Sequence, residues 1–267
     1  MASVDLIWKN GRFGQTSRRD AWWVSPLGVF LGLGAFVVYS TWAAFQGNHY
    51  WYGPYLSPMY APEFFGDSPH ALIPGPQPGW WPMVLPFSPA FLILWAPALF
   101  RFTCYYYRGA YYKAFWADPP SCAVSEPRTT YWGERTLPLV LHNAHRYVFY
   151  IAVIFIGILA YDSWIAFWFA NGQGGKKFGI GVGSLVLTLN TILLGAYTFG
   201  CHCSRHLCGG GMDRISESAI KSKLYAITSW LNDRHKQFAW ASLFSVGFAD
   251  IYVRLCSMGI WADLRLL

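Results

Sequence analysis

Five long apolar stretches constrain this chain more than any other feature of its sequence. A helix that crosses a bilayer needs about 20 mostly apolar residues, and five segments meet that requirement: Trp23–Phe45, Met83–Thr103, Arg146–Ala170, Phe178–Gly200 and Phe238–Ile260. Charged residues make up only 12% of the chain and aromatic residues 19%, whereas an ordinary soluble domain has about 25% charged residues. The sequence therefore predicts an all-α integral membrane protein, a single five-helix bundle over residues 1–267, with Trp and Tyr at the membrane interfaces.

The same composition excludes three other classes of protein. Disordered chains are poor in aromatic residues and rich in charge. A disulfide-stapled mini-protein would be shorter and richer in cysteine than a chain of 267 residues with six Cys. The net charge of +7 does not indicate a nucleic-acid partner, because the basic residues are confined to particular segments of the chain.

The basic residues also predict how the five helices are oriented. Sixteen of the 20 Lys and Arg residues lie in the N-terminal segment, at Arg146 and in the loops 101–137 and 201–237, and the other four lie at the opposite helix ends. Positively charged loops stay in the cytoplasm, so we expect a cytoplasmic N-terminus and an outside C-terminus. We expect no signal peptide, because no cleavable apolar core follows the first basic residues. Residues 47–82 are rich in Gly, Pro and aromatics and predict an irregular outer cap.

Two charged residues fall inside the fifth span. Asp250 and Arg254 are four residues apart, a spacing that allows them to pair on one face of a helix. We interpret the pair as structural, with a role in a proton path as the alternative. A transporter or channel would need polar residues near the bilayer middle. The sequence offers only this pair and the glycines Gly179, Gly181 and Gly183, and it contains no internal repeat.

Potential metal ligands gather at the predicted inner ends of four helices. Cys104 follows the second span and His145 precedes the third, while Cys201 follows the fourth and His235 precedes the fifth. Four helices that each project one ligand into a shared core are a standard way to build a cofactor site. Two thiolates and two imidazoles match a Rieske-type 2Fe–2S cluster, and the same set suits tetrahedral zinc. Taken singly, each Cys also suits packing and each His an interfacial anchor.

Other ligand sets stay open at this point. His202 and His206 are four residues apart in the run CHCSRHLC and could hold a metal from one helix. The outer halves of the five spans contain no His, which disfavours two stacked b haems. One haem near the inner face is possible, with His145 and either His235 or His206 as its axial ligands.

The run from Arg101 to Arg108, RFTCYYYR, combines aromatic and basic residues. Its ordinary interpretation is an interfacial belt, with Tyr at headgroup depth and Arg reaching toward water. The functional alternative is a docking surface or a quinone pocket, where Tyr hydroxyls and Arg side chains donate hydrogen bonds to quinone carbonyls.

Several motifs resemble the membrane-anchor protein, of the cytochrome b type, of actinobacterial-type succinate dehydrogenases, respiratory complex II. They are RFTCYYYRGAYYKAFWADPPSCAV at Arg101–Val124, HNAHRY at His142–Tyr147, CHCSRH at Cys201–His206, RHKQFAWASLF at Arg234–Phe244, and WKNGRF with RRDAWW near the N-terminus. The resemblance covers nearly the whole chain. It implies a multi-pass protein of the bacterial inner membrane that anchors a flavoprotein and an iron–sulfur subunit. It also implies delivery of electrons from succinate to a membrane quinone.

The chain departs from one pattern of the wider complex II family, whose single-chain five-span anchors bind two b haems through His on four helices. Here the outer His residues are missing and Cys104 and Cys201 stand at two of the four inner positions. The ligand chemistry therefore favours a Rieske-like 2Fe–2S cluster over one b haem, and Tyr105 and Arg146, beside the ligands, become candidates for binding quinone. An anchor with zinc or without a redox cofactor is the remaining alternative.

Overall fold

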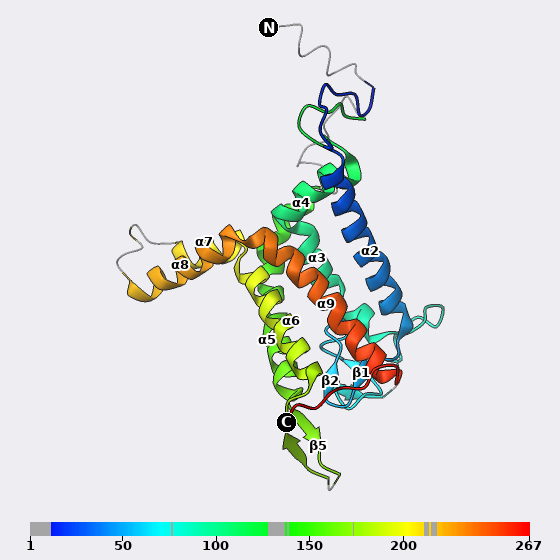
Figure 1. Ribbon diagram of the computed structural model, residues 1–267. Coiled ribbons are helices and arrows are strands. Elements are labelled where there is room, and N and C mark those ends of the chain that lie inside the picture. Colours follow the sequence, from blue (N-terminus) through cyan, green and yellow to red (C-terminus); the bar gives the residue numbers. More distant parts are fainter. Residues whose placement is uncertain are drawn as a thin grey trace. The chain divides into compact units, whose positions relative to one another are not determined.

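The computed structural model describes residues 12–75, 77–127, 137, 139–172, 174–210, 214 and 218–267 (Figure 1). The basic residues Lys9, Arg128 and Arg135, used above for the orientation, lie outside this part of the chain. The chain divides into two compact units. Unit 1 contains Met1–Val37 and Leu99–His145, and unit 2 contains Val38–Ala98 and Arg146–Leu267.

Four helices of the described chain are long and apolar enough to cross a membrane. They are α2 (Val24–Gln46), α5 (His145–Ile165), α6 (Val182–Phe199) and α9 (His235–Ser257), and they overlap the first, third, fourth and fifth predicted spans. The third and fourth spans are shorter than predicted. The residues between α5 and α6 instead form β5 (Trp168–Ala170) and β6 (Lys176–Phe178), which pair antiparallel.

The second predicted span, Met83–Thr103, is not one continuous helix. It contains the 3-10 turn η1 (Pro89–Leu92) and the short helix α3 (Trp95–Thr103). Proline has no backbone N–H to donate and clashes with the preceding turn, so Pro86 and Pro89 prevent a helix from continuing through residues 83–89, and Pro97 cannot donate to the carbonyl of Ile93. Cys104 is extended, with φ −65° and ψ 130°, and separates α3 from α4 (Tyr105–Tyr111). A π-helical turn, η2 (Tyr112–Trp116), follows.

Unit 1 joins the N-terminal segment to the turn that follows η2. The backbone N–H of Gly14 donates to Ser125 O at 3.1 Å, and the N–H of Ser125 donates to Gln15 O at 3.0 Å. The Arg18 guanidinium donates to the Ser121 hydroxyl at 2.8 Å and pairs with Asp20. Two of the quoted sequence motifs are therefore parts of one local structure. The 3-10 turn η3 (Leu139–Ala144) then leads into α5.

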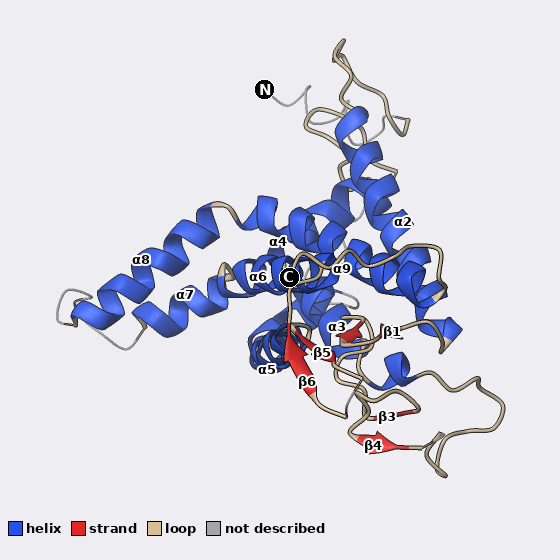
Figure 2. Cartoon of the chain, turned by 60° about the horizontal axis from the view of Figure 1, so that its bottom comes forward, coloured by secondary structure: helices blue, strands red, loops and turns tan. Residues whose placement is uncertain are grey.

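Unit 2 is built on the packing of α6 against α9. Its core consists of Tyr55, Ala166, Phe169, Leu187, Ala249 and Val253. Residues 47–82 form a mostly irregular segment with the two-residue strands β1 (Trp51–Tyr52), β2 (Tyr55–Leu56), β3 (Phe65–Gly66) and β4 (Ile73–Pro74) (Figure 2). Tyr55 fits against α6 because residue 183 is glycine, since a Cβ at Gly183 would lie 2.5 Å from the Tyr55 ring.

The other end of α6 leads into two further helices of unit 2. α7 (His202–Gly209) and α8 (Ala219–Asp233) pack against each other as a hairpin. Figure 1 shows this hairpin leaving the end of α6 sideways and returning to the start of α9. We call α7 and α8 together the arm.

Candidate functional site

In unit 1, residues just before Cys104 contact the side chain of His145. Cys104 is buried at the break between α3 and α4. The ring of His145 stacks on Phe100 with centroids 4.8 Å apart, and its Nδ1 lies 2.8 Å from the Thr103 hydroxyl oxygen. The residue before one predicted ligand therefore positions the other, across 42 positions of sequence.

The contacts of Thr103 favour one tautomer of His145. The Thr103 hydroxyl oxygen lies 2.8 Å from both Leu99 O and His145 Nδ1, and a hydroxyl that donates its single hydrogen to Leu99 O accepts from His145 Nδ1–H. A neutral imidazole that is protonated at Nδ1 carries its lone pair at Nε2. Metal-binding histidines are commonly held in this way by a partner on the nitrogen that does not ligate.

In unit 2 Cys201 and Cys203 form a pair at the start of α7. Cys201 is buried, and its sulfur accepts a hydrogen bond from the Cys203 backbone N–H at 3.4 Å. A hydrogen bond with Cys201 and the charge of Arg146 lower the pKa of Cys203 to about 7, against the opposite effect of burial. A thiol with a lowered pKa is a better metal ligand, because the thiolate is the form that binds. Cys203 was not among the predicted ligands, although the spacing Cys-x-Cys was a signal for it.

His235 is the first residue of α9, and its ring stacks on Tyr197 in the last turn of α6, with centroids 5.0 Å apart. The Asn232 side chain donates to Gly200 O at 2.8 Å. This hydrogen bond ties the residues just before His235 to the residue just before Cys201. Unit 2 therefore brings the predicted ligands Cys201 and His235 to the same end of α6 and α9, while Cys104 and His145 belong to unit 1.

His202 and His206, the alternative metal ligands, also lie close together. The Nε2 atoms of His202 and His206 are 3.0 Å apart on the exposed face of α7. Burial, with the nearby charges of His206 and Arg205, lowers the pKa of His202.

The two predicted quinone-binding residues lie in different units. Tyr105, in unit 1, is 79% exposed, and the guanidinium of Arg108 lies 5.4 Å from the centre of its ring. Arg146, in unit 2, is exposed in the first turn of α5. Quinone binding by these two residues stays a prediction.

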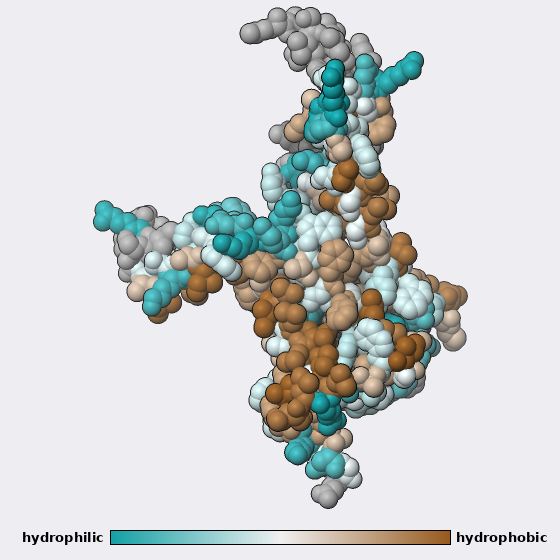
Figure 3. Space-filling model, in the orientation of Figure 1, coloured by the Kyte–Doolittle hydropathy of each residue, from teal (hydrophilic) through white to brown (hydrophobic). Residues whose placement is uncertain are grey.

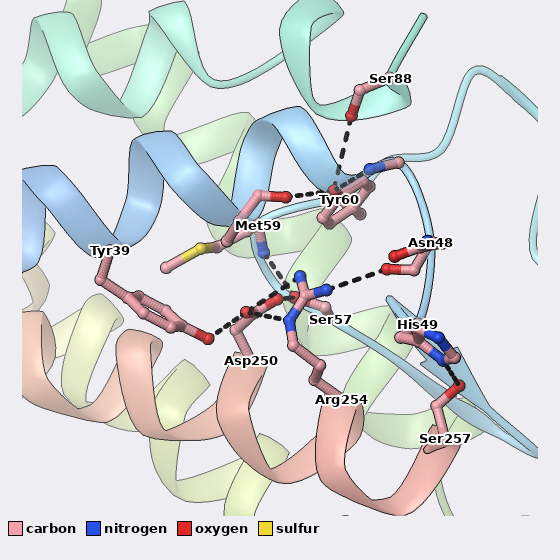
Figure 4. A network of polar contacts seen from close by, with 12 residues as sticks. Tyr39, Asn48, His49, Ser57, Met59, Tyr60, Ser88, Asp250, Arg254 and Ser257 are labelled. Atoms are coloured by element: carbon pink, nitrogen blue, oxygen red, sulfur yellow. Dashed lines mark hydrogen bonds and ion pairs between the residues drawn. The ribbon is translucent and has the colours of Figure 1, made fainter.

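The predicted pairing of Asp250 with Arg254 is confirmed. Arg254 Nε and Nη2 each lie 3.4 Å from Asp250 Oδ2, and both side chains are buried (Figure 4). The Tyr39 hydroxyl donates to the same oxygen at 2.5 Å, and the Ser57 hydroxyl donates to Oδ1. Arg254 also donates to Asn48 O at 3.0 Å. Both carboxylate oxygens therefore have partners, from α2, α9 and residues 47–82.

Asn190 is a further polar residue inside a spanning helix, which the sequence pattern did not single out. Its side chain is 1% exposed on α6, and neither its amide nitrogen nor its amide oxygen has a hydrogen-bond partner among the described residues. A buried polar group without a partner costs free energy.

Comparisons with known proteins agree with the predicted resemblance. The family described as actinobacterial succinate dehydrogenase subunit SdhC matches residues 24–259. Among solved structures, the chain is similar to one in the Mycobacterium smegmatis Sdh1 complex in the apo form, with 40% sequence identity and a TM-score of 0.82. That similarity covers 94% of each chain. A comparison with curated proteins finds no match. The chain therefore belongs to the actinobacterial succinate dehydrogenase subunit SdhC family, as a multi-pass inner-membrane subunit that associates with other subunits of that enzyme.

Proposed function

We propose that this subunit anchors a succinate:quinone oxidoreductase and passes electrons to a membrane quinone through a Rieske-like 2Fe–2S cluster. Cys104 and Cys201 would bind one iron, and His145 and His235 the other. The observation that carries the cluster is the 2.8 Å contact between the Thr103 hydroxyl oxygen and His145 Nδ1, which favours the tautomer with its lone pair at Nε2. The two buried thiols and two imidazoles supply the donor set of such a cluster.

The residues around these ligands have distinct roles in this proposal. A bound cluster of this type would carry one electron at a potential that its imidazole ligands raise. Thr103 holds His145 in the ligating tautomer. The Cys203 N–H donates to the Cys201 sulfur, and hydrogen bonds to ligating sulfurs tune the potential of a cluster. Cys203 is the alternative to Cys104 as the second thiolate ligand, because the pKa of its thiol is lowered to about 7.

The quinone would bind beside the cluster, with Tyr105 and Arg146 donating hydrogen bonds to its carbonyl oxygens. The iron–sulfur subunit, which receives electrons from the flavoprotein, would dock on the basic end of the anchor by charge complementarity. In this proposal the N-terminus and the arm would lie in the cytoplasm. The segment from η1 through α3 would complete a fifth crossing of the membrane, and the C-terminus would lie outside.

One b haem between His145 and His235 is the second candidate for the cofactor, because both imidazoles stack on aromatic rings at helix starts. The haem and the cluster need the same two histidines but differ in their need for cysteine. Substitution of the cysteines therefore separates the two candidates.

The deciding experiment is low-temperature EPR together with a visible absorption spectrum on the purified complex after reduction with dithionite. We expect a rhombic Rieske-type signal and no reduced b-haem band. His145→Ala and His235→Ala should each abolish this signal and quinone reduction, and Cys201→Ser should do the same. Cys122→Ser is the matched control, because Cys122 is exposed and has no proposed role.

Cys104→Ser and Cys203→Ser then identify the second thiolate, since only the ligand's loss should remove the signal. A strong b-haem band without the rhombic signal would refute the cluster. Full assembly with unchanged quinone reduction in all ligand variants would identify a structural anchor without a redox cofactor.

A further inference from the structure

The arm is held at a fixed angle to the end of α6. The Asn232 side chain donates to Gly200 O at 2.8 Å, and a Cβ at Gly200 would lie 3.0 Å from Leu231 O. The close approach therefore depends on glycine at this position. Within the arm, the Arg205 guanidinium donates to the Tyr225 hydroxyl at 2.8 Å. These contacts attach the arm firmly to the rest of unit 2. The arm leaves the end of α6 sideways (Figure 1).

One face of α8 is apolar and exposed. Ile220, Leu224, Ile227 and Trp230 are between 46% and 73% exposed. The first three are spaced by four and three residues, which places them on one side of a helix. No other described element covers Ile220, Leu224 and Ile227, whereas the Trp230 ring contacts Phe238 of α9 and the Arg234 guanidinium. In Figure 3 most of the apolar colour of the arm lies on the side that faces the body of α6, and hydrophilic colour covers the opposite side and part of the tip.

The charges of α8 are arranged around this apolar face. Lys221 and Lys223 follow Ile220 by one and three residues and so lie on opposite flanks of the stripe formed by Ile220, Leu224 and Ile227, with Lys223 on the side of Trp230. Ala226, two residues after Leu224, lies on the far side of the helix and is exposed. The one acidic residue of α8, Asp233, is at its last position. An apolar stripe with a lysine on each flank is typical of a helix that lies in a membrane interface.

We propose that the arm lies flat in the headgroup region at its end of α6, with the apolar face of α8 in the acyl chain boundary and Lys221 and Lys223 on the phosphates of anionic lipids. The direction of α6 gives the position of the arm relative to the membrane. α6 is long and apolar enough to cross the bilayer, and the arm leaves its end sideways. The lysines favour lipid over a protein partner, since Lys is depleted at protein interfaces and basic residues bind anionic leaflets. The arm would then fix the depth of the Cys201 and His235 end of the bundle.

The test measures the depth of two positions on α8 in the complete complex. p-Acetylphenylalanine placed at Leu224, or at Ala226 as the matched control, is labelled with a hydroxylamine nitroxide, which leaves the native cysteines untouched. The complex is reconstituted in nanodiscs that contain phosphatidylglycerol. EPR collision rates are measured with oxygen, which concentrates in lipid, and with a nickel chelate, which stays in water.

We expect a severalfold higher ratio of oxygen to nickel collisions at Leu224 than at Ala226. Replacing phosphatidylglycerol by phosphatidylcholine, or combining Lys221→Gln with Lys223→Gln, should reduce that ratio severalfold at Leu224. Nickel access at Leu224 equal to that at Ala226 would place the face in water and overturn the proposal. An immobile label at Leu224 that neither reagent reaches would show that a protein covers the face, with the same consequence. A membrane depth that is indifferent to lipid charge and to both lysines would overturn the assignment to anionic lipid.

Discussion

The Tyr39 hydroxyl donates a hydrogen bond of 2.5 Å to Oδ2 of Asp250, the same oxygen that Arg254 contacts. The two residues are 211 positions apart, so the contact joins the second half of α2 to the middle of α9. The Ser57 hydroxyl on Oδ1 adds the cap segment to the same carboxylate. A buried charge is tolerated when it is paired and hydrogen-bonded, and the pair here supports the structural interpretation given from the sequence.

Removal of the carboxylate alone should destabilise the subunit strongly. Asp250→Ala would leave Arg254 buried without its counter-charge, which costs about 3–5 kcal/mol. Thermal unfolding of the purified complex in detergent measures this loss. The double variant Asp250→Leu with Arg254→Met should recover most of the stability. A stable Asp250→Ala variant with impaired quinone reduction would instead favour the proton-path alternative.

Thr103→Val should weaken the proposed cofactor site without touching a ligand. The variant loses the hydrogen bond that holds the His145 tautomer, and loss of such a partner typically lowers metal affinity about 10–100-fold. Iron content and the EPR signal of the purified complex report the effect. Thr103→Ser, which keeps the hydroxyl, should retain both. Full iron occupancy in Thr103→Val would show that Thr103 does not position His145.

Gly183→Ala should destabilise unit 2, because the new Cβ would lie 2.5 Å from the Tyr55 ring. Overpacking of this kind costs about 1–3 kcal/mol. Gly195→Ala on the same helix is the control, since its Cβ would meet Ile156 at an ordinary 3.8 Å and a helical Gly→Ala change is otherwise favourable. Equal melting temperatures for the two variants would contradict the close approach of Tyr55 to α6.

The segment that contains His70 should lose stability as the pH falls. Burial lowers the pKa of His70 in the folded protein, and its Nε2 lies 3.1 Å from Gly53 O. The unfolded segment therefore takes up a proton first, so stability present above about pH 6.5 is lost as the pH falls through the folded pKa. Hydrogen exchange around Gly53, corrected for intrinsic rates, should accelerate at acidic pH. His70→Gln should remove the pH dependence.

Asn190→Leu tests whether polar groups inside α6 serve transport or proton transfer. The buried amide has no partner among the described residues, so an apolar residue of similar size should leave stability unchanged or raise it. We expect quinone reduction in the variant to stay close to that of the native complex. A large loss of activity in a stable variant would show that Asn190 takes part in a polar path through the bundle.

The pattern of apolar residues was sufficient to place α2, α5, α6 and α9 to within a few residues at most of their ends, because a lipid-facing helix must be apolar along its whole length. It did not predict the break in Met83–Thr103. Hydropathy alone does not register that Pro86, Pro89 and Pro97 interrupt the backbone hydrogen bonds of a continuous helix, or that Cys104 is extended.

For the candidate site, too, the sequence determined some features and the tertiary structure determined others. The sequence alone determined the membrane class and the supply of Cys and His at helix ends, since both follow from residue type and position along the chain. Only the tertiary structure decided that Thr103 orients His145, that Tyr39 and Ser57 complete the shell of Asp250, and that Cys203 lies beside Cys201 with a pKa lowered to about 7. Most of these contacts join residues from 42 to 211 positions apart. Hydrogen bonds and charge effects depend on distances of a few ångströms, which the packing of helices fixes and the order of residues along the chain does not.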